Sequence, residues 1–193
     1  RIAQADALIA KGKLTEAENI YFSILAKEPS AQIHNWLGML YLKQKKYDKA
    51  VVSFSSALKV NPRYYKARYN RAIAYNALNE YDKAVADYKE VIRYFEAHAK
   101  SHFNLGLLYY KHDAYGKAAE EFQRTADLSS GDRKAKALYM LGKSDLQMSP
   151  PKREEAAAAF TAAIRLKPDH VGARLALIEL QYPEDEGGYK KRL

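Results

Sequence analysis

KKYDKAVVSF (residues 45–54) and NEYDKAVADY (residues 79–88) are two nearly identical stretches of this sequence. The shared Tyr-Asp-Lys-Ala-Val begins at Tyr47 in the first stretch and at Tyr81 in the second, 34 residues later. A third version, YGKAAEEF, begins at Tyr115 after the same interval. A fixed period of this size is typical of stacked supersecondary units, so we expect the chain to be an array of repeats.

Each copy contains two stretches with the apolar spacing of an amphipathic helix, joined by a short polar turn. In the second copy Leu37, Leu40 and Tyr41 recur at three- and four-residue spacing, and the same spacing continues after Tyr47. Pro62 then ends the second stretch, because proline lacks the backbone N–H that an inner helical turn requires. The alternation of a β-strand is not sustained anywhere. We therefore predict an all-α fold.

The recurring residues resemble the tetratricopeptide repeat, whose pattern is L-G-x-x-Y, then A-x-x-x-F, then a closing proline. The second copy matches this pattern at Leu37, Gly38, Tyr41, Ala50, Phe54, Ala57 and Pro62. The other copies keep the pattern with substitutions, such as Arg71 and Ala72 for leucine and glycine in the third. The resemblance implies a right-handed α-solenoid of helix-turn-helix repeats.

The resemblance further implies how the chain is divided. We expect one solenoid over residues 1–183 and a polar tail at residues 184–193. The five units are expected at about residues 1–30, 31–64, 65–98, 99–134 and 135–170, followed by a capping helix at residues 171–183. SSGDRK (residues 129–134) is expected to lengthen the junction after the fourth unit, and QMSPPKRE (residues 147–154) the internal turn of the fifth.

Composition narrows the classes of function. The 193 residues are 48% hydrophobic and 28% charged, and no apolar run approaches the roughly 20 residues of a membrane span. The absence of cysteine excludes disulfides, thiolate zinc sites and cysteine nucleophiles. The net charge of +9 favours acidic partners, or else reflects a solvated basic surface. We interpret Arg1 as a processing boundary, so targeting signals could lie upstream and the compartment stays open.

Motifs that would carry catalysis are weak. GKS at residues 142–144 resembles the end of a phosphate-binding loop, but the loop needs a preceding strand and a glycine where Ala137 stands. His98 and His102 are four residues apart and could offer two metal ligands, yet no third ligand is evident, so we interpret them as exposed histidines. No paired-acid or Ser–His–Asp arrangement follows from the spacing. We expect neither enzymatic activity nor a cofactor or metal.

The first helix of each unit carries more apolar residues than repeat packing requires, and the surplus forms a second stripe. Its members are Asn35, Met39 and Leu42 in the second unit, Tyr69, Ile73 and Asn76 in the third, Phe103, Leu107 and Tyr110 in the fourth, and Tyr139, Lys143 and Leu146 in the fifth. In tetratricopeptide repeat proteins this face lines a concave groove where peptides or partner helices dock. An apolar band on a surface marks an interaction site. We expect Tyr69 and Phe103 to point into the groove without contacting essential core side chains.

Polar residues accompany the second stripe. Lys66, Lys100 and Lys136 occupy one equivalent position in three successive units and form a basic edge. Asn70 and Asn104 occupy another, where a carboxamide can bond a peptide backbone as donor and acceptor.

Family members that grip the acidic C-termini of heat-shock chaperones use a clamp of lysines, asparagines and an arginine. Asn70 and Lys100 fit that scheme, whereas Asn35 and Met39 replace the upstream lysine–asparagine pair and Asn104 replaces the arginine. We therefore expect the clamp to be absent.

The sequence thus predicts a non-catalytic scaffold that binds a protein partner, as an extended and possibly acidic peptide or as a helix, in its concave groove. Two alternatives remain open. The second stripe or the incomplete first unit could mediate a homo-oligomer, and the basic edge could bind nucleic acid or anionic lipid, the weaker alternative.

Overall fold

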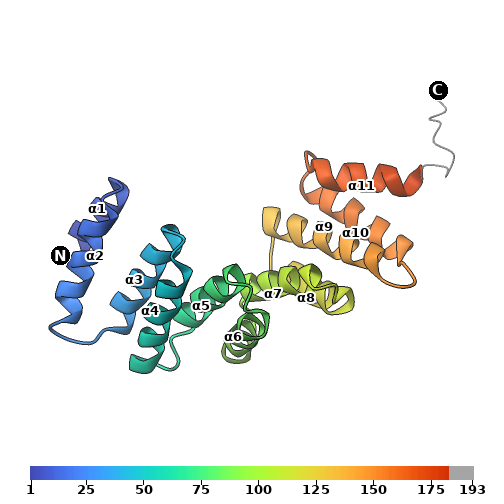
Figure 1. Cartoon of the computed structure of the whole chain (residues 1–193). Coiled ribbons are helices and arrows are strands. Elements are labelled where there is room, and N and C mark those ends of the chain that lie inside the picture. Colours follow the sequence, from blue (N-terminus) through green and yellow to red (C-terminus); the bar gives the residue numbers. More distant parts are fainter. Residues whose placement is uncertain (183–193) are drawn as a thin grey trace. The chain divides into compact units, whose positions relative to one another are not determined.

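The computed structural model describes residues 1–182, which form eleven α-helices and no β-strand within that range (Figure 1). The predicted all-α class is confirmed. The polar tail expected at residues 184–193 lies outside the described residues. No helix within residues 1–182 has the length and hydrophobicity to cross a membrane.

The helices pair as hairpins, one hairpin per repeat. They are α1 (Ile2–Ala10) with α2 (Leu14–Leu25), α3 (Ala31–Lys43) with α4 (Tyr47–Val60), α5 (Tyr65–Ala77) with α6 (Tyr81–Tyr94), α7 (Ala99–Lys111) with α8 (Tyr115–Asp127), and α9 (Gly131–Gln147) with α10 (Arg153–Leu166). Helix α11 (Val171–Gln181) follows and packs on α10. The first four hairpins lie within the ranges expected for the first four units, whereas α9 begins four residues before the expected start of the fifth unit at residue 135.

The chain divides into two compact units, one over Arg1–Glu96 and one beginning at Ala97. In the first, α2 packs on α3 and α4 packs on α5, so that three hairpins stack in sequence order. In the second, α8 packs on α9 and α10 packs on α11. A single solenoid over residues 1–183 stays a prediction.

The turn inside each of the first four hairpins contains one residue with left-handed backbone geometry. These residues are Gly12, Lys45, Asn79 and Asp113, with φ between 57° and 73°. Glycine adopts this geometry without steric cost, and asparagine and aspartate tolerate it better than other residues. The geometry ends the first helix and reverses the chain within three residues.

The fifth repeat departs from this design. Its internal turn spans residues 148–152, so the predicted lengthening by QMSPPKRE is confirmed. The predicted lengthening of the preceding junction is wrong, because that junction is only residues 128–130 and α9 already begins at Gly131. The extra residues instead add a turn to the start of α9. SSGDRK lacks the proline found at residue 62, and Asp132 in the first turn interacts favourably with the helix dipole.

The two helices of a hairpin approach closely where a glycine faces a phenylalanine. A Cβ atom at Gly38 would lie 2.5 Å from the Phe54 ring, one at Gly106 would lie 2.8 Å from the Phe122 ring, and one at Gly142 would lie 2.7 Å from the Phe160 ring. The three phenylalanines are fully buried. Ala72 and Tyr88 hold the corresponding positions in the third repeat and are buried as well. The small residue therefore sets the distance between the helices.

We predict that Gly106→Ala destabilises the protein by about 1–3 kcal/mol, because the new methyl group must displace Phe122 from a close-packed site. Gly116→Ala is the matched control, since a Cβ there has no atom within 4 Å. It should stabilise helix α8 by roughly 0.5–1 kcal/mol. Urea unfolding followed by circular dichroism measures both. Equal midpoints for Gly106→Ala and the parent would show that the two helices do not depend on this contact.

Candidate functional site

The second stripe of the first compact unit lies on α3 and α5. Met39 is the most exposed of its apolar members, at 48%, and Leu42 and Ile73 are half-buried. Asn35 is buried, so its predicted place on the groove surface is wrong. Its side chain donates to Met39 Sδ at 3.6 Å and accepts from Asn70 Nδ2 at 3.0 Å. The hydrogen bond between the two asparagines therefore joins α3 to α5.

The aromatic members of the second stripe contact the core, contrary to the expectation for Tyr69 and Phe103. Tyr69 lies against Tyr88 with ring centroids 5.9 Å apart, and Phe103 lies against Phe122 at 5.6 Å. Tyr139 repeats the contact with Phe160 at 5.9 Å. The reason is the small residue three positions later in each first helix. Because no bulky side chain stands there, the aromatic ring of the second helix reaches the first helix and contacts the ring of the stripe residue.

In the second compact unit the stripe lies on α7 and α9. Leu107 is exposed, whereas Tyr110 is half-buried against Tyr115 at a centroid distance of 5.3 Å. The ammonium group of Lys143 lies 5.3 Å from the Tyr110 ring centroid and 5.9 Å from that of Tyr139. Cation–π attraction thus holds this charge between two helices.

The remaining polar candidates differ in their surroundings. Lys66, Lys100 and Lys136 of the basic edge are exposed, and none forms an ion pair with another residue in the range 1–182. Asn76 and Asn104 are half-buried. The structure places Lys66 in the first compact unit, and Lys100 and Lys136 in the second. The basic edge therefore presents exposed ammonium groups on each unit separately.

The two histidines are not exposed, and that interpretation of the sequence is wrong. His98 is half-buried with Nδ1 2.8 Å from the Ser101 hydroxyl, and His102 is buried with Nδ1 2.7 Å from a carboxylate oxygen of Glu121. Burial, with the positive charge of Lys100 nearby, lowers the pKa of His98. No three metal-ligating side chains cluster within the described part of the chain. His102 thus joins α7 to α8, and His98 lies at the start of α7.

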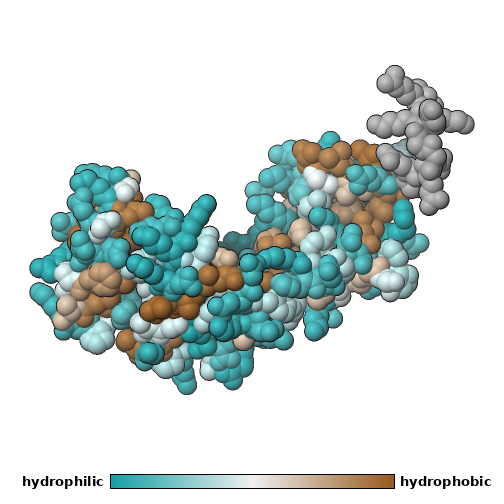
Figure 2. Space-filling view, viewed as in Figure 1, coloured by the Kyte–Doolittle hydropathy of each residue, from teal (hydrophilic) through white to brown (hydrophobic). Residues whose placement is uncertain are grey.

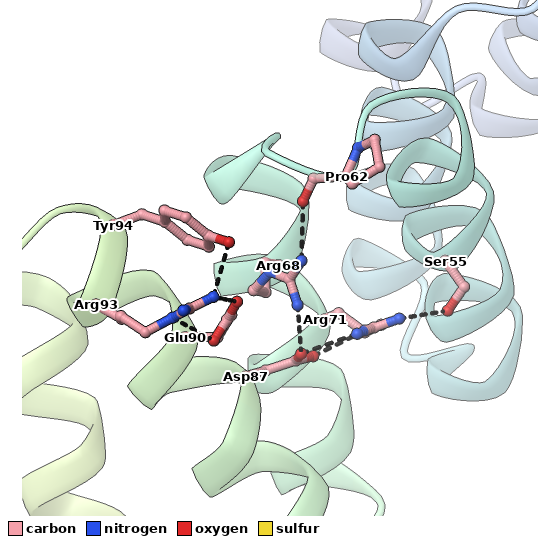
Figure 3. Close-up of polar contacts among 8 residues, drawn as sticks. All are labelled: Ser55, Pro62, Arg68, Arg71, Asp87, Glu90, Arg93 and Tyr94. Carbon is pink, nitrogen blue, oxygen red and sulfur yellow. Dashed lines mark hydrogen bonds and ion pairs between the residues drawn. The ribbon is translucent and has the colours of Figure 1, made fainter.

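The sequence patterns did not predict a half-buried ionic network in the third repeat (Figure 3). Arg71 donates from Nε and Nη2 to the two carboxylate oxygens of Asp87 at 2.7 and 2.8 Å, and from Nη1 to the Ser55 hydroxyl at 3.0 Å. Arg68 donates to the carbonyl of Pro62 at 2.8 Å and has its Nη1 3.8 Å from Asp87. The guanidinium of Arg71 thus joins α4, α5 and α6.

One feature of the sequence indicates this network. Arg71 stands where the second, fourth and fifth repeats have Leu37, Leu105 and Leu141, and Asp87 stands where the second repeat has Ser53. Two charges of opposite sign replace two uncharged residues within one hairpin, so they compensate each other. The hydrogen bonds from Arg71 to Asp87 raise the pKa of the guanidinium, which stays charged despite its burial.

Stacked helical hairpins with an open first-helix face define the α-solenoid class, whose members contact partners over extended surfaces. Tetratricopeptide repeat family models match residues 31–64 and residues 72–133. The first match coincides with the predicted second unit. The chain belongs to the tetratricopeptide repeat family, as the resemblance predicted, and it is a protein-interaction scaffold, typical of that family.

Solved structures show the same fold. YrrB, described as a tetratricopeptide repeat protein with an unusual peptide-binding site, is 22% identical, and the alignment covers 91% of this chain and 89% of YrrB with a TM-score of 0.74. The C-terminal part of a tetratricopeptide repeat-containing protein from Cytophaga hutchinsonii is 18% identical. The alignment covers 97% of this chain and 74% of the Cytophaga chain, with a TM-score of 0.80. MamA from Desulfovibrio magneticus RS-1 is 21% identical over 87% of this chain and 93% of its own, with a TM-score of 0.76. No curated protein sequence matches the chain.

We predict that Asp87→Ser destabilises the protein by about 2–3 kcal/mol, because it leaves the half-buried guanidinium of Arg71 without its carboxylate. The double variant Arg71→Leu with Asp87→Ser restores the pair found in the second repeat, Leu37 and Ser53, and should recover most of the loss. Urea unfolding of the two variants and the parent measures this. If the double variant is no more stable than Asp87→Ser, the network is not what holds this hairpin together.

Proposed function

We propose that this scaffold binds an extended protein segment along the first-helix face of its repeats, on α3 and α5 in one compact unit and on α7 and α9 in the other. The observation that carries the proposal is the exposure of Met39 and Leu107 on these two faces. They lie on the second stripe, at one equivalent position two repeats apart. Each unit thus offers a peptide an exposed apolar side chain on its first-helix face.

The charges beside these faces favour an acidic partner. Lys66, Lys100 and Lys136 are exposed at one repeated position, and Lys143 adds a cation that the rings of two tyrosines hold in place. A peptide carrying aspartate or glutamate could pair with these ammonium groups. The peptide-binding site described for YrrB supports the use of this fold for such a purpose.

The structure changes which residues should be tested. Tyr69 and Phe103 contact buried aromatic rings, so their removal would disturb the hairpins as well as the binding face. Met39 and Leu107 expose more of their surface and are better probes. Val60 at the end of α4 is similarly exposed, at 45%, but belongs to a second helix, and it is the matched control.

We predict that Met39→Glu with Leu107→Glu abolishes peptide binding while the protein stays folded, because surface substitutions change stability by only about 0.5 kcal/mol. A display library of random short peptides is selected on the parent, and the enriched peptides are tested on each variant by fluorescence anisotropy. Val60→Glu should bind them like the parent, and the enriched peptides should be rich in aspartate and glutamate. Binding that survives Met39→Glu with Leu107→Glu would place the peptide site elsewhere.

Helix α11 favours a second candidate function, assembly of copies of the chain. Val171, Leu175, Ile178 and Tyr182 are each more than half exposed and recur at four- and three-residue spacing (Figure 2 shows hydrophobic surface along this helix). Ile178 stands at the position that Gly38, Gly106 and Gly142 occupy in the repeats. A second helix cannot approach α11 as closely as the hairpin partners approach each other. A looser contact with the same face of another copy would cover the apolar side chains.

If copies associate through α11, Leu175→Glu with Ile178→Glu should convert the oligomer into a monomer, because it would place four carboxylates across the two-fold contact. Sedimentation equilibrium at several protein concentrations measures the mass. Met39→Glu with Leu107→Glu should leave the mass unchanged, which separates assembly from peptide binding. A parent protein that is monomeric at every concentration would refute the assembly.

A further inference from the structure

The second helices of the first two repeats are separated by a cleft on the side of the hairpins away from the second stripe. Its volume is about 620 Å³, within the range of roughly 300–1,000 Å³ typical of ligand pockets. Its walls are α2 and α4, and its floor is α3. We call it the α2–α4 cleft and define it by Phe22, Leu25, Ala26, His34, Leu37, Tyr41, Asp48, Lys49, Val52, Ser53 and Ser56. All of these residues lie within one compact unit.

The walls of the α2–α4 cleft are partly apolar. Phe22 on α2 is 48% exposed and Val52 on α4 is 66% exposed, and the two helices carry hydrophobic surface in Figure 2. An occupant with an apolar stem would cover these two side chains.

The polar groups of the cleft are mainly hydrogen-bond acceptors. The hydroxyl of Ser53 donates to the Lys49 carbonyl at 2.9 Å, and that of Ser56 donates to the Val52 carbonyl at 3.0 Å. Their hydrogens are therefore used, and each oxygen offers lone pairs. Asp48 adds a carboxylate. These groups call for an occupant that donates several hydrogen bonds.

The charged groups in and around the cleft do not oppose a cationic occupant. The pKa of His34 is lowered by burial, so the imidazole is neutral at pH 7 and adds no repulsion. The ammonium of Lys49 lies 5.6 Å from the centroid of the Tyr41 ring, whose face attracts it. The Tyr41 hydroxyl donates to a second carboxylate, that of Glu18, at 2.6 Å. Within the lining the carboxylate of Asp48 therefore balances the one ammonium group, and Glu18 adds a carboxylate beside Tyr41, outside the lining.

In the next repeat, side chains of the protein itself fill the space that corresponds to the α2–α4 cleft. The positions of His34, Leu37 and Ser53 are held there by Arg68, Arg71 and Asp87. As Figure 3 shows, the guanidinium of Arg71 bridges α4 and α6, the next pair of second helices, and bonds a serine hydroxyl as well as the carboxylate. In the second repeat the shorter Leu37 leaves the corresponding space open.

We propose that the α2–α4 cleft binds an arginine side chain of a partner protein, with its aliphatic stem on Phe22 and Val52 and its guanidinium on Ser53, Ser56 and Asp48. Arginine meets both requirements, since it joins an apolar stem to five N–H donors in a planar fork. The site is distinct from the first-helix faces, so one scaffold can hold two partners, or two segments of one partner, at once.

The test uses the full chain and a blocked Leu-Arg-Leu tripeptide, with otherwise identical peptides in which citrulline or lysine replaces arginine. Titrations are followed by the backbone amide resonances of the ¹⁵N-labelled protein. The arginine peptide should shift resonances of α2 and α4 around Phe22 and Ser53. Citrulline keeps the shape but loses the charge, and lysine cannot bond two acceptors side by side. Both should bind roughly tenfold more weakly, the factor expected when one charge-assisted hydrogen bond is lost.

Two variants test the acceptors. Asp48→Asn should weaken the arginine peptide roughly tenfold, and Ser53→Asp, which copies Asp87 of the next repeat, should tighten it by a similar factor. If Ser53→Asp does not fold, Asp48→Asn decides alone. Equal affinity for the arginine and citrulline peptides, equal affinity for the arginine and lysine peptides, unchanged affinity of Asp48→Asn, or resonance shifts confined to α3 and α5 would each overturn the assignment.

Discussion

The contact between a small residue on the first helix of a hairpin and an aromatic ring on the second is the constraint on which this structure depends. At Gly38, Gly106 and Gly142 the phenylalanine ring occupies the space that a Cβ atom would need. This approach fixes the spacing of the two helices and buries the ring completely. It also determines whether the ring of the second helix contacts the aromatic residue of the second stripe on the first helix.

The repeated frame leaves the chain free to vary what lies between its second helices. The third repeat places Arg71 there and neutralises it with Asp87, whereas the second repeat keeps Leu37 and Ser53 and leaves a cleft of about 620 Å³. Both solutions are compatible with the same backbone, because each unit contacts only its neighbours. Stability is thus shared among several contacts, and a single repeat can give up packing for a binding site. A solenoid can therefore change the surface of one repeat while the other repeats keep their packing.

The two faces of the hairpins therefore offer different chemistry. The first-helix faces combine exposed Met39 and Leu107 with exposed lysines, for which we propose an acidic segment as the partner. The α2–α4 cleft presents acceptors and suits a donor-rich side chain. A chain with a net charge of +9 can thus contact partners of either sign, since local arrangement and not net charge determines recognition. The exposed side of α11 adds a third, uncharged surface.

The sequence alone determined the repeat, its register, the all-α class and the family, because apolar spacing and small residues recur at a fixed interval. It also placed Met39 and Leu107 on an exposed face. Only the tertiary structure decided that Asn35 and His102 are buried, that Tyr69 and Phe103 rest on core rings, and that SSGDRK extends a helix. Periodicity assigns a residue to one side of its own helix. Whether that side is buried depends on how closely the neighbouring helix approaches and on which charged residues the neighbouring helix carries. The sequence pattern of a single helix contains no information on either point.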